Sequence, residues 1–110
     1  MSELTSIEEL QITEQALQNF AMQKQIFQLE LLETNSALEE LNNLKTDEVY
    51  KVVGSIMIKT NKDNQIKELK KKSDILELRL KSIEKQEEEL KNKVLKARSE
   101  YLKKTKVEKK

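Results

Sequence analysis

The densest group of side chains that could do acid–base chemistry is a run of three glutamates, Glu87, Glu88 and Glu89. The surrounding residues predict a helix, and consecutive helical positions point around the helix axis in different directions. Because the three carboxylates therefore do not converge on one substrate, general acid–base catalysis is not expected from them. The sequence also contains no histidine, the commonest general base and metal ligand, and no cysteine. The protein is predicted not to be an enzyme.

Loops that bind nucleotides or calcium ions are not found in the sequence either. Phosphate-binding loops need two or more glycines at fixed spacing, and this sequence has one glycine, Gly54. It also has no aspartate-rich stretch of the calcium-binding kind. We therefore expect no cofactor and no metal site.

A basic segment closes the sequence, and its charge raises the possibility of an anionic partner. Five of its last eight residues are lysines, which could neutralise nucleic-acid phosphates. Proteins that bind single strands also stack bases on aromatic side chains and arginines, and these eight residues include neither. Nucleic-acid binding is therefore disfavoured. The lysines are Lys103, Lys104, Lys106, Lys109 and Lys110.

The composition indicates long helices exposed to solvent. Of the 110 residues, 36% are hydrophobic and 37% are charged, and two phenylalanines and two tyrosines are the whole aromatic supply. This is little for a globular core, whereas a coiled coil buries only a narrow stripe of each helix. No stretch resembles a membrane-spanning segment or a secretory signal. A cytoplasmic location is expected.

Apolar residues recur at steps of three and four in two long segments. Seven of eleven such positions are apolar in the first segment and nine of eleven in the second. The spacing predicts helices over about residues 4–45 and 62–106, paired antiparallel along these two seams. Helix-start signals stand at residues 5–8 and 60–63. The seams are Leu10, Thr13, Leu17, Phe20, Lys24, Phe27, Leu31, Thr34, Leu38, Leu41 and Lys45, and Ile66, Leu69, Ser73, Leu76, Leu80, Ile83, Glu87, Leu90, Val94, Ala97 and Tyr101.

Charge supports the antiparallel pairing. Residues 1–50 hold ten acidic and two basic side chains, a net charge of −8, and residues 51–110 hold ten acidic and nineteen basic ones, a net charge of +9. The two segments attract each other when they fold back on one another, although each exposed pair contributes little. Two charged residues, Lys24 and Glu87, fall within the seams at about the same level. They either form an ion pair that fixes the register or leave Lys24 extended to solvent.

The segment VYKVVGSIMIKT, residues 49–60, predicts a β-hairpin over about residues 48–60. A two-residue type II′ turn at Gly54–Ser55 places Val53 opposite Ile56 and Lys51 opposite Ile58. Apolar side chains then stand on both faces. One face carries Val49, Val53, Ile56 and Ile58, and the other carries Tyr50, Val52 and Met57.

A lone two-stranded hairpin is marginally stable in water, and both its edges are open. We therefore expect this one to assemble, with hairpins of several chains pairing edge to edge and closing into a barrel. The alternative is a turn that merely reverses a coiled coil. That role needs only about four or five residues and leaves the longer β-rich run unexplained.

The segments Glu48–Lys59, Leu76–Leu80 and Ile83–Glu87 resemble the β subunits of prefoldin, particularly the archaeal type. The resemblance extends over essentially the whole chain, and its most specific part is the single hairpin with glycine at the turn, since α-type subunits carry two hairpins. It implies a mainly α fold in one prefoldin-like domain, residues 1–110. In that fold an antiparallel two-helix coiled coil carries one central β-hairpin, which assembles into an intersubunit β-barrel.

The resemblance also implies a function and partners. It implies an ATP-independent chaperone that holds unfolded client proteins and delivers them to a group II chaperonin, as a hexamer of two α-type and four β-type subunits. No nucleic acid and no membrane are expected as partners. A structural coiled-coil tether or scaffold is the competing function, and suppression of the aggregation of a denatured protein without ATP would separate the two.

Three groups of residues are predicted to carry these functions. The hairpin residues Val49, Tyr50, Val52, Val53, Gly54, Ile56, Met57 and Ile58 are expected to mediate assembly. The five terminal lysines are expected to dock on the chaperonin, unless the tail only keeps the helices soluble. Apolar residues near the chain ends are expected to bind clients, unless they are ordinary seam and surface residues: Leu4, Ile7, Leu10, Ile12, Leu95, Tyr101, Leu102 and Val107.

Overall fold

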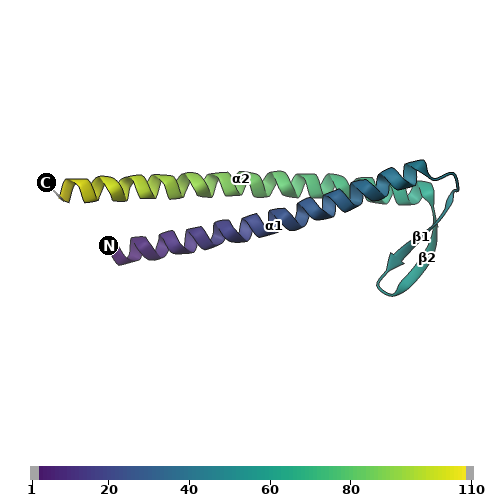
Figure 1. The fold of residues 1–110 in the computed structure, drawn as a ribbon, viewed down its shortest axis with the longest axis horizontal. Coiled ribbons are helices and arrows are strands. Elements are labelled where there is room, and N and C mark those ends of the chain that lie inside the picture. Colours follow the sequence, from purple (N-terminus) through teal and green to yellow (C-terminus); the bar gives the residue numbers. More distant parts are fainter. Residues whose placement is uncertain (1–2, 109–110) are drawn as a thin grey trace. The chain divides into compact units, whose positions relative to one another are not determined.

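The computed structural model describes residues 3–108, which form two long helices joined by a β-hairpin (Figure 1). The elements follow one another as α1 (Glu3–Asn43), β1 (Glu48–Val53), β2 (Ile56–Asn61) and α2 (Lys62–Glu108). This mainly helical architecture with one antiparallel hairpin is the one that the sequence predicts. The chain divides into two compact units: a hairpin unit, Ile26–Leu80, and a terminal unit, made of the chain up to Gln25 and from Lys81 onward.

The helix starts agree with the sequence signals in one case and differ in the other. At α2, the side-chain oxygen Oδ1 of Asn61 accepts a hydrogen bond from the backbone N–H of Asn64 at 2.8 Å, so the expected cap is present. At α1, the helix already includes Glu3, one residue before the predicted start at about residue 4, so the capping pattern at residues 5–8 lies inside the helix. Glutamate and leucine, which precede Thr5 in the sequence, are strong helix formers and extend the helix through the capping pattern.

The end of α1 falls two residues before the predicted one. The helix ends at Asn43, and the backbone N–H of Leu44 bonds the carbonyl of Leu41 at 3.2 Å. This bond spans three residues, one fewer than an α-helical bond, and it tightens and closes the last turn of the helix. Lys45, which the seam pattern had included, is therefore outside α1 and exposed.

In the hairpin unit, α1 and α2 pack along the predicted seams. Leu76 is the most deeply buried residue, with 2% of its surface exposed, and Leu41 and Leu80 are also buried. Two polar seam residues are buried beside them and have hydrogen-bond partners. The hydroxyl of Thr34 donates to the carbonyl of Glu30 at 2.7 Å, and that of Ser73 donates to Oδ1 of Asn35 at 3.1 Å. Because these groups are satisfied, they do not destabilise the seam.

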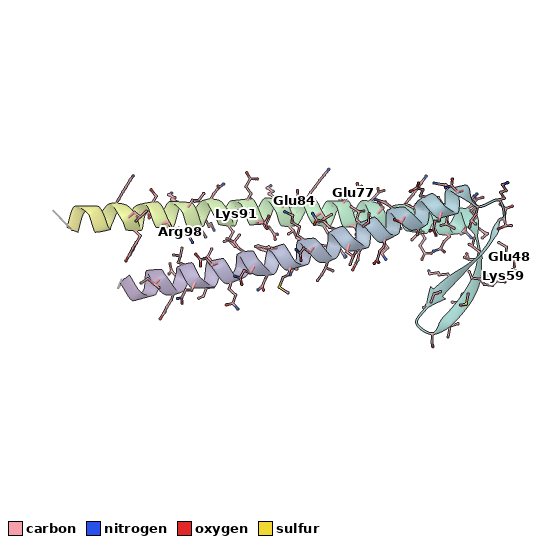
Figure 2. The ribbon with its side chains drawn as sticks, in the orientation of Figure 1. Glu48, Lys59, Glu77, Glu84, Lys91 and Arg98 are labelled. Carbon is pink, nitrogen blue, oxygen red and sulfur yellow. The ribbon has the colours of Figure 1, made fainter. Side chains whose placement is uncertain are left out.

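In the terminal unit, the seam of α2 is buried at Ile83, Glu87 and Val94, but not as far as predicted. Its last two positions, Ala97 and Tyr101, are exposed. The methyl group of Ala97 is too short to fill a layer between two helices, and in the described part of α2 no side chain beyond Val94 is buried. An ion pair between Arg98 of α2 and Glu14 of α1 joins the helices at this level instead (Figure 2).

The two charged seam residues, Lys24 and Glu87, form an ion pair, which is the first of the two alternatives that the sequence left open. Nζ of Lys24 lies 3.4 Å from Oε1 of Glu87, and the Glu87 side chain is only 11% exposed. Lys91, one turn further along α2, lies 3.8 Å from the same oxygen. Lys24 is therefore not simply extended to solvent. That the pair fixes the helix register remains a prediction.

A single and a double substitution test what this pair contributes. Lys24→Leu leaves the carboxylate of Glu87 buried with only the more distant Lys91, and we expect it to lower the free energy of unfolding by about 1–2 kcal/mol. Lys24→Leu combined with Glu87→Leu replaces the pair by an apolar layer and should be at least as stable as the parent. Thermal unfolding followed by circular dichroism measures both. A single variant as stable as the parent would show that the pair contributes nothing.

Candidate assembly and client-binding surfaces

The hairpin has the register that the sequence predicts. Val53 pairs with Ile56 and Lys51 with Ile58, and the strands remain in register back to Glu48 opposite Asn61. Gly54 has a φ of 61°, and the φ of Ser55 is not positive. A type II′ turn requires both conditions. Only glycine takes this conformation without strain, which explains why the single glycine of the chain stands here.

Pairing across the strands defines two faces of the hairpin. The face nearer the helices, called the inner face below, is partly covered at its base, where Val49 is buried and Thr60 is half-buried. The opposite, outer face is exposed along its whole length. The inner face consists of Val49, Lys51, Val53, Ile56, Ile58 and Thr60, and the outer face consists of Glu48, Tyr50, Val52, Met57, Lys59 and Asn61.

Most apolar side chains of the hairpin face solvent. Val52, Ile56 and Met57 each expose more than 60% of their surface, and the turn stands clear of both helices (Figure 1). In the part of the chain that the structure describes, β1 and β2 pair only with each other, so each keeps an edge of unpaired backbone groups. The hairpin thus combines apolar faces with open edges, which is a surface suited to pairing with other strands.

A groove of about 770 Å³ lies between the hairpin and the helices of the same unit. One wall is strand β1 from Val49 to Val52, and Leu41, Leu69, Ile75 and Leu76 of the helices contribute apolar surface to it. The groove was not expected from the sequence, because periodicity along the chain does not give the angle between a hairpin and a helix pair.

A small number of polar contacts tie the hairpin to the helices. Nζ of Lys51 on β1 lies 2.5 Å from Oε1 of Glu68 on α2. Lys62 contributes two bonds at the base: its backbone N–H donates to the carbonyl of Asp47 and its Nζ to the carbonyl of Leu44, both at 2.7 Å. The other ion pair of the hairpin, Glu48 with Lys59 at 2.7 Å, joins the two strands and does not reach the helices (Figure 2).

The structure places most of the predicted client-binding residues in the terminal unit. Ile12, Leu95 and Leu102 each expose more than 60% of their surface, and Ile7 and Tyr101 expose a little under half. Leu10 is half-buried in the seam, so it is less accessible than expected. The side chains of Leu4 and Val107 lie outside the described part of the structure.

The predicted docking lysines can be placed only in part. Lys103 is exposed near the end of α2. The side chains of Lys104 and Lys106, and all of Lys109 and Lys110, lie outside what the structure describes.

Sequence analysis overlooked a second set of exposed apolar residues. Ile26 and Leu29 on α1 and Leu78 on α2 are each more than half exposed, in the hairpin unit. They stand at helical spacing on the side away from the seams, and this spacing was the signal that could have identified them.

Two features that would indicate a metal site or a membrane span are absent from residues 3–108. No group of acidic side chains there is close enough to hold a metal ion. No helix there combines the length and apolar character that crossing a membrane requires.

Comparison with known proteins connects this arrangement to one family. The sequence model of the family described as "Prefoldin subunit" matches residues 5–108. The prefoldin β subunit of Thermococcus kodakarensis is 45% identical over 87 residues, which cover 78% of this chain and 74% of that protein. The prefoldin β subunit of Methanosarcina acetivorans is 44% identical over 85 residues, which cover 76% of this chain and 73% of that protein.

Solved structures agree with the sequence comparison. The crystal structure of the prefoldin β subunit from Thermococcus strain KS-1 matches with a TM-score of 0.80 and 40% identity, over 88% of this chain and 86% of that one. The β2 subunit of the same strain, at 21% identity and a TM-score of 0.70, shares the fold. From its hairpin, its paired helices and these relatives, we conclude that the chain belongs to the prefoldin subunit family, as a chaperone subunit similar to the β type.

Proposed function

We propose that this chain is a subunit of an ATP-independent holding chaperone. Its hairpin assembles with those of other subunits, two α-type and four β-type chains in all, into intersubunit β-barrels. The ends of its helices capture unfolded proteins and deliver them to a group II chaperonin in the cytoplasm. Family membership supports the chaperone role, and the exposed surfaces of this chain support the separate steps.

The exposed hairpin is the observation that carries the proposal. Two strands alone are marginally stable, and these two present apolar side chains on both faces as well as open edges. Covering one such side chain completely contributes about 1.5–3 kcal/mol. Strands of neighbouring subunits would cover the faces and pair with the edges at the same time.

Client capture is assigned to the exposed apolar residues of the terminal unit. Ile12, Leu95 and Leu102 stand singly on helices whose own stability comes from their seams. Separate apolar contacts of this kind make each interaction weak and independent of the client's exact sequence. A chaperone that holds many non-native chains needs both properties. A tether needs no such contacts.

Assembly is tested by placing charge on the hairpin. Ile56→Lys with Ile58→Lys would bury ammonium groups in the assembled barrel, so we expect monomers or dimers with nearly unchanged helix content. Ile26→Lys with Leu29→Lys is the matched control, because these residues are about equally exposed but lie on α1. Light scattering gives the mass of each complex. An unchanged mass for the hairpin variant contradicts the barrel.

Client holding is tested at the three most exposed candidate residues. Ile12→Ser, Leu95→Ser and Leu102→Ser together should weaken suppression of aggregation of a denatured protein, measured without ATP, while the oligomer stays intact. Ile26→Ser, Leu29→Ser and Leu78→Ser form the control set in the hairpin unit. If the parent suppresses no aggregation, the chain is a tether. If the control set loses as much activity, the client surface is not confined to the terminal unit.

Chaperonin docking is tested on the basic tail. Changing Lys103, Lys104, Lys106, Lys109 and Lys110 to Ser should slow association with a group II chaperonin and leave client holding largely unchanged. The reason is that exposed charges steer encounters and are screened by salt. Association rates at low and high ionic strength provide the measurement. Equal rates for variant and parent at low ionic strength would exclude the tail as the docking element.

A further inference from the structure

One charged residue stands on the inner face of the hairpin. Lys51 has Val49 and Val53 as its neighbours on the same face of β1, and Ile58 is opposite it on β2. No other residue of the inner face carries a charge. If another subunit covers this face, an ammonium group without a partner there opposes assembly, because burying an isolated charge is strongly unfavourable.

Glu68 of α2 supplies the partner. Its Oε1 lies 2.5 Å from Nζ of Lys51, within the hairpin unit, and the two side chains are 54% and 37% exposed. The contact draws the ammonium group toward α2 at the groove between β1 and the helices, which both residues line. The bonds of Lys62 to Asp47 and Leu44 hold only the base of the hairpin. Lys51, in the middle of β1, is three residues nearer the turn than Glu48, where the strand begins.

We propose that the Lys51–Glu68 ion pair is a positioning element for assembly. It holds the hairpin in one orientation against α2 and neutralises the single charge of the inner face, so that a strand of another subunit can cover that face. The assembly part of this inference rests on the proposed function, whereas the orientation of the hairpin can be measured in the chain itself.

The pair should matter more for assembly than for folding. While both side chains remain largely in water, an ion pair of this kind contributes little to stability. Once a neighbouring subunit covers the face, loss of Glu68 leaves the ammonium group of Lys51 in a site that excludes water, which is far more unfavourable. Glu68→Gln should therefore leave thermal unfolding of the helices nearly unchanged and weaken assembly.

The orientation is measured with two spin labels. The chain has no cysteine, so labels at Ser55→Cys in the turn and Asp74→Cys on α2 are specific. Labelled chains are diluted with unlabelled ones so that only distances within one chain are recorded. We expect the distance distribution to be measurably broader with Glu68→Gln than in the parent, since even a weak pair shifts the populations of hairpin orientations, and to regain the parent's width when Lys51→Glu is combined with Glu68→Lys.

The matched control uses the ion pair within the hairpin. Glu48→Gln removes the partner of Lys59, a pair of the same chemistry at 2.7 Å that does not involve a helix (Figure 2). It should leave the label distances unchanged. If Glu68→Gln also leaves them unchanged, or if the charge reversal does not restore them, the positioning role is wrong.

Assembly provides the second readout. With an α-type partner, Glu68→Gln should raise the dissociation constant of the complex by at least about tenfold, and the charge reversal should recover most of the loss. Glu48→Gln should have no comparable effect. Equal dissociation constants for the parent and Glu68→Gln overturn the assembly role. A parent that forms no complex overturns the proposed function itself, and the label distances then still decide whether the pair positions the hairpin.

Discussion

A sheet of two strands leaves the backbone N–H and C=O groups along both of its edges without partner strands, and the rest of the structure depends on this constraint. Along the edge that points away from the other strand, each strand of the hairpin has backbone groups without a partner strand in the described chain. The helices of the same chain cannot cover the hairpin, because their apolar seams are already packed against each other. They bury only its base, at Val49, and beyond that α2 contacts the hairpin through the Lys51–Glu68 ion pair. The rest of the hairpin is exposed, and we propose that other subunits cover it.

The helix pair can support an exposed hairpin because it is stabilised separately. Its core consists of apolar seam residues such as Leu76, with the polar seam residues Thr34 and Ser73, whose hydroxyls donate to the Glu30 carbonyl and to Asn35. No buried side-chain nitrogen or oxygen in the described residues lacks a partner. Changes at the hairpin therefore need not unfold the helices. This independence supports the proposed division of roles, with assembly at the hairpin and client binding in the terminal unit.

Features that depend on spacing along the chain could be predicted from the sequence. A single glycine between two β-rich runs determined the turn, and the two-residue period then determined the register. The three-and-four spacing identified most of the seam positions and placed Lys24 and Glu87 at about the same level of two antiparallel seams, but it left open whether the two would form an ion pair.

Features that depend on side-chain size or on angles between elements could not be predicted in this way. Ala97 fits the apolar pattern, but its side chain is too small to close a layer. The capping pattern at residues 5–8 was overridden by helix formers before it. Lys51 and Glu68 are seventeen residues apart, and only the angle of the hairpin against α2 brings them together. Periodicity does not encode that angle.

Hydrogen exchange of the backbone amides of β1 and β2 tests the central claim most directly, because it measures whether other strands complete the hairpin. The chain is examined alone at low concentration and in complex with an α-type subunit. We predict slow exchange in the complex for the amides on the outer edges of both strands and fast exchange in the dilute chain. Fast exchange of these amides in a complex of full mass would show that the hairpin is not the assembly element.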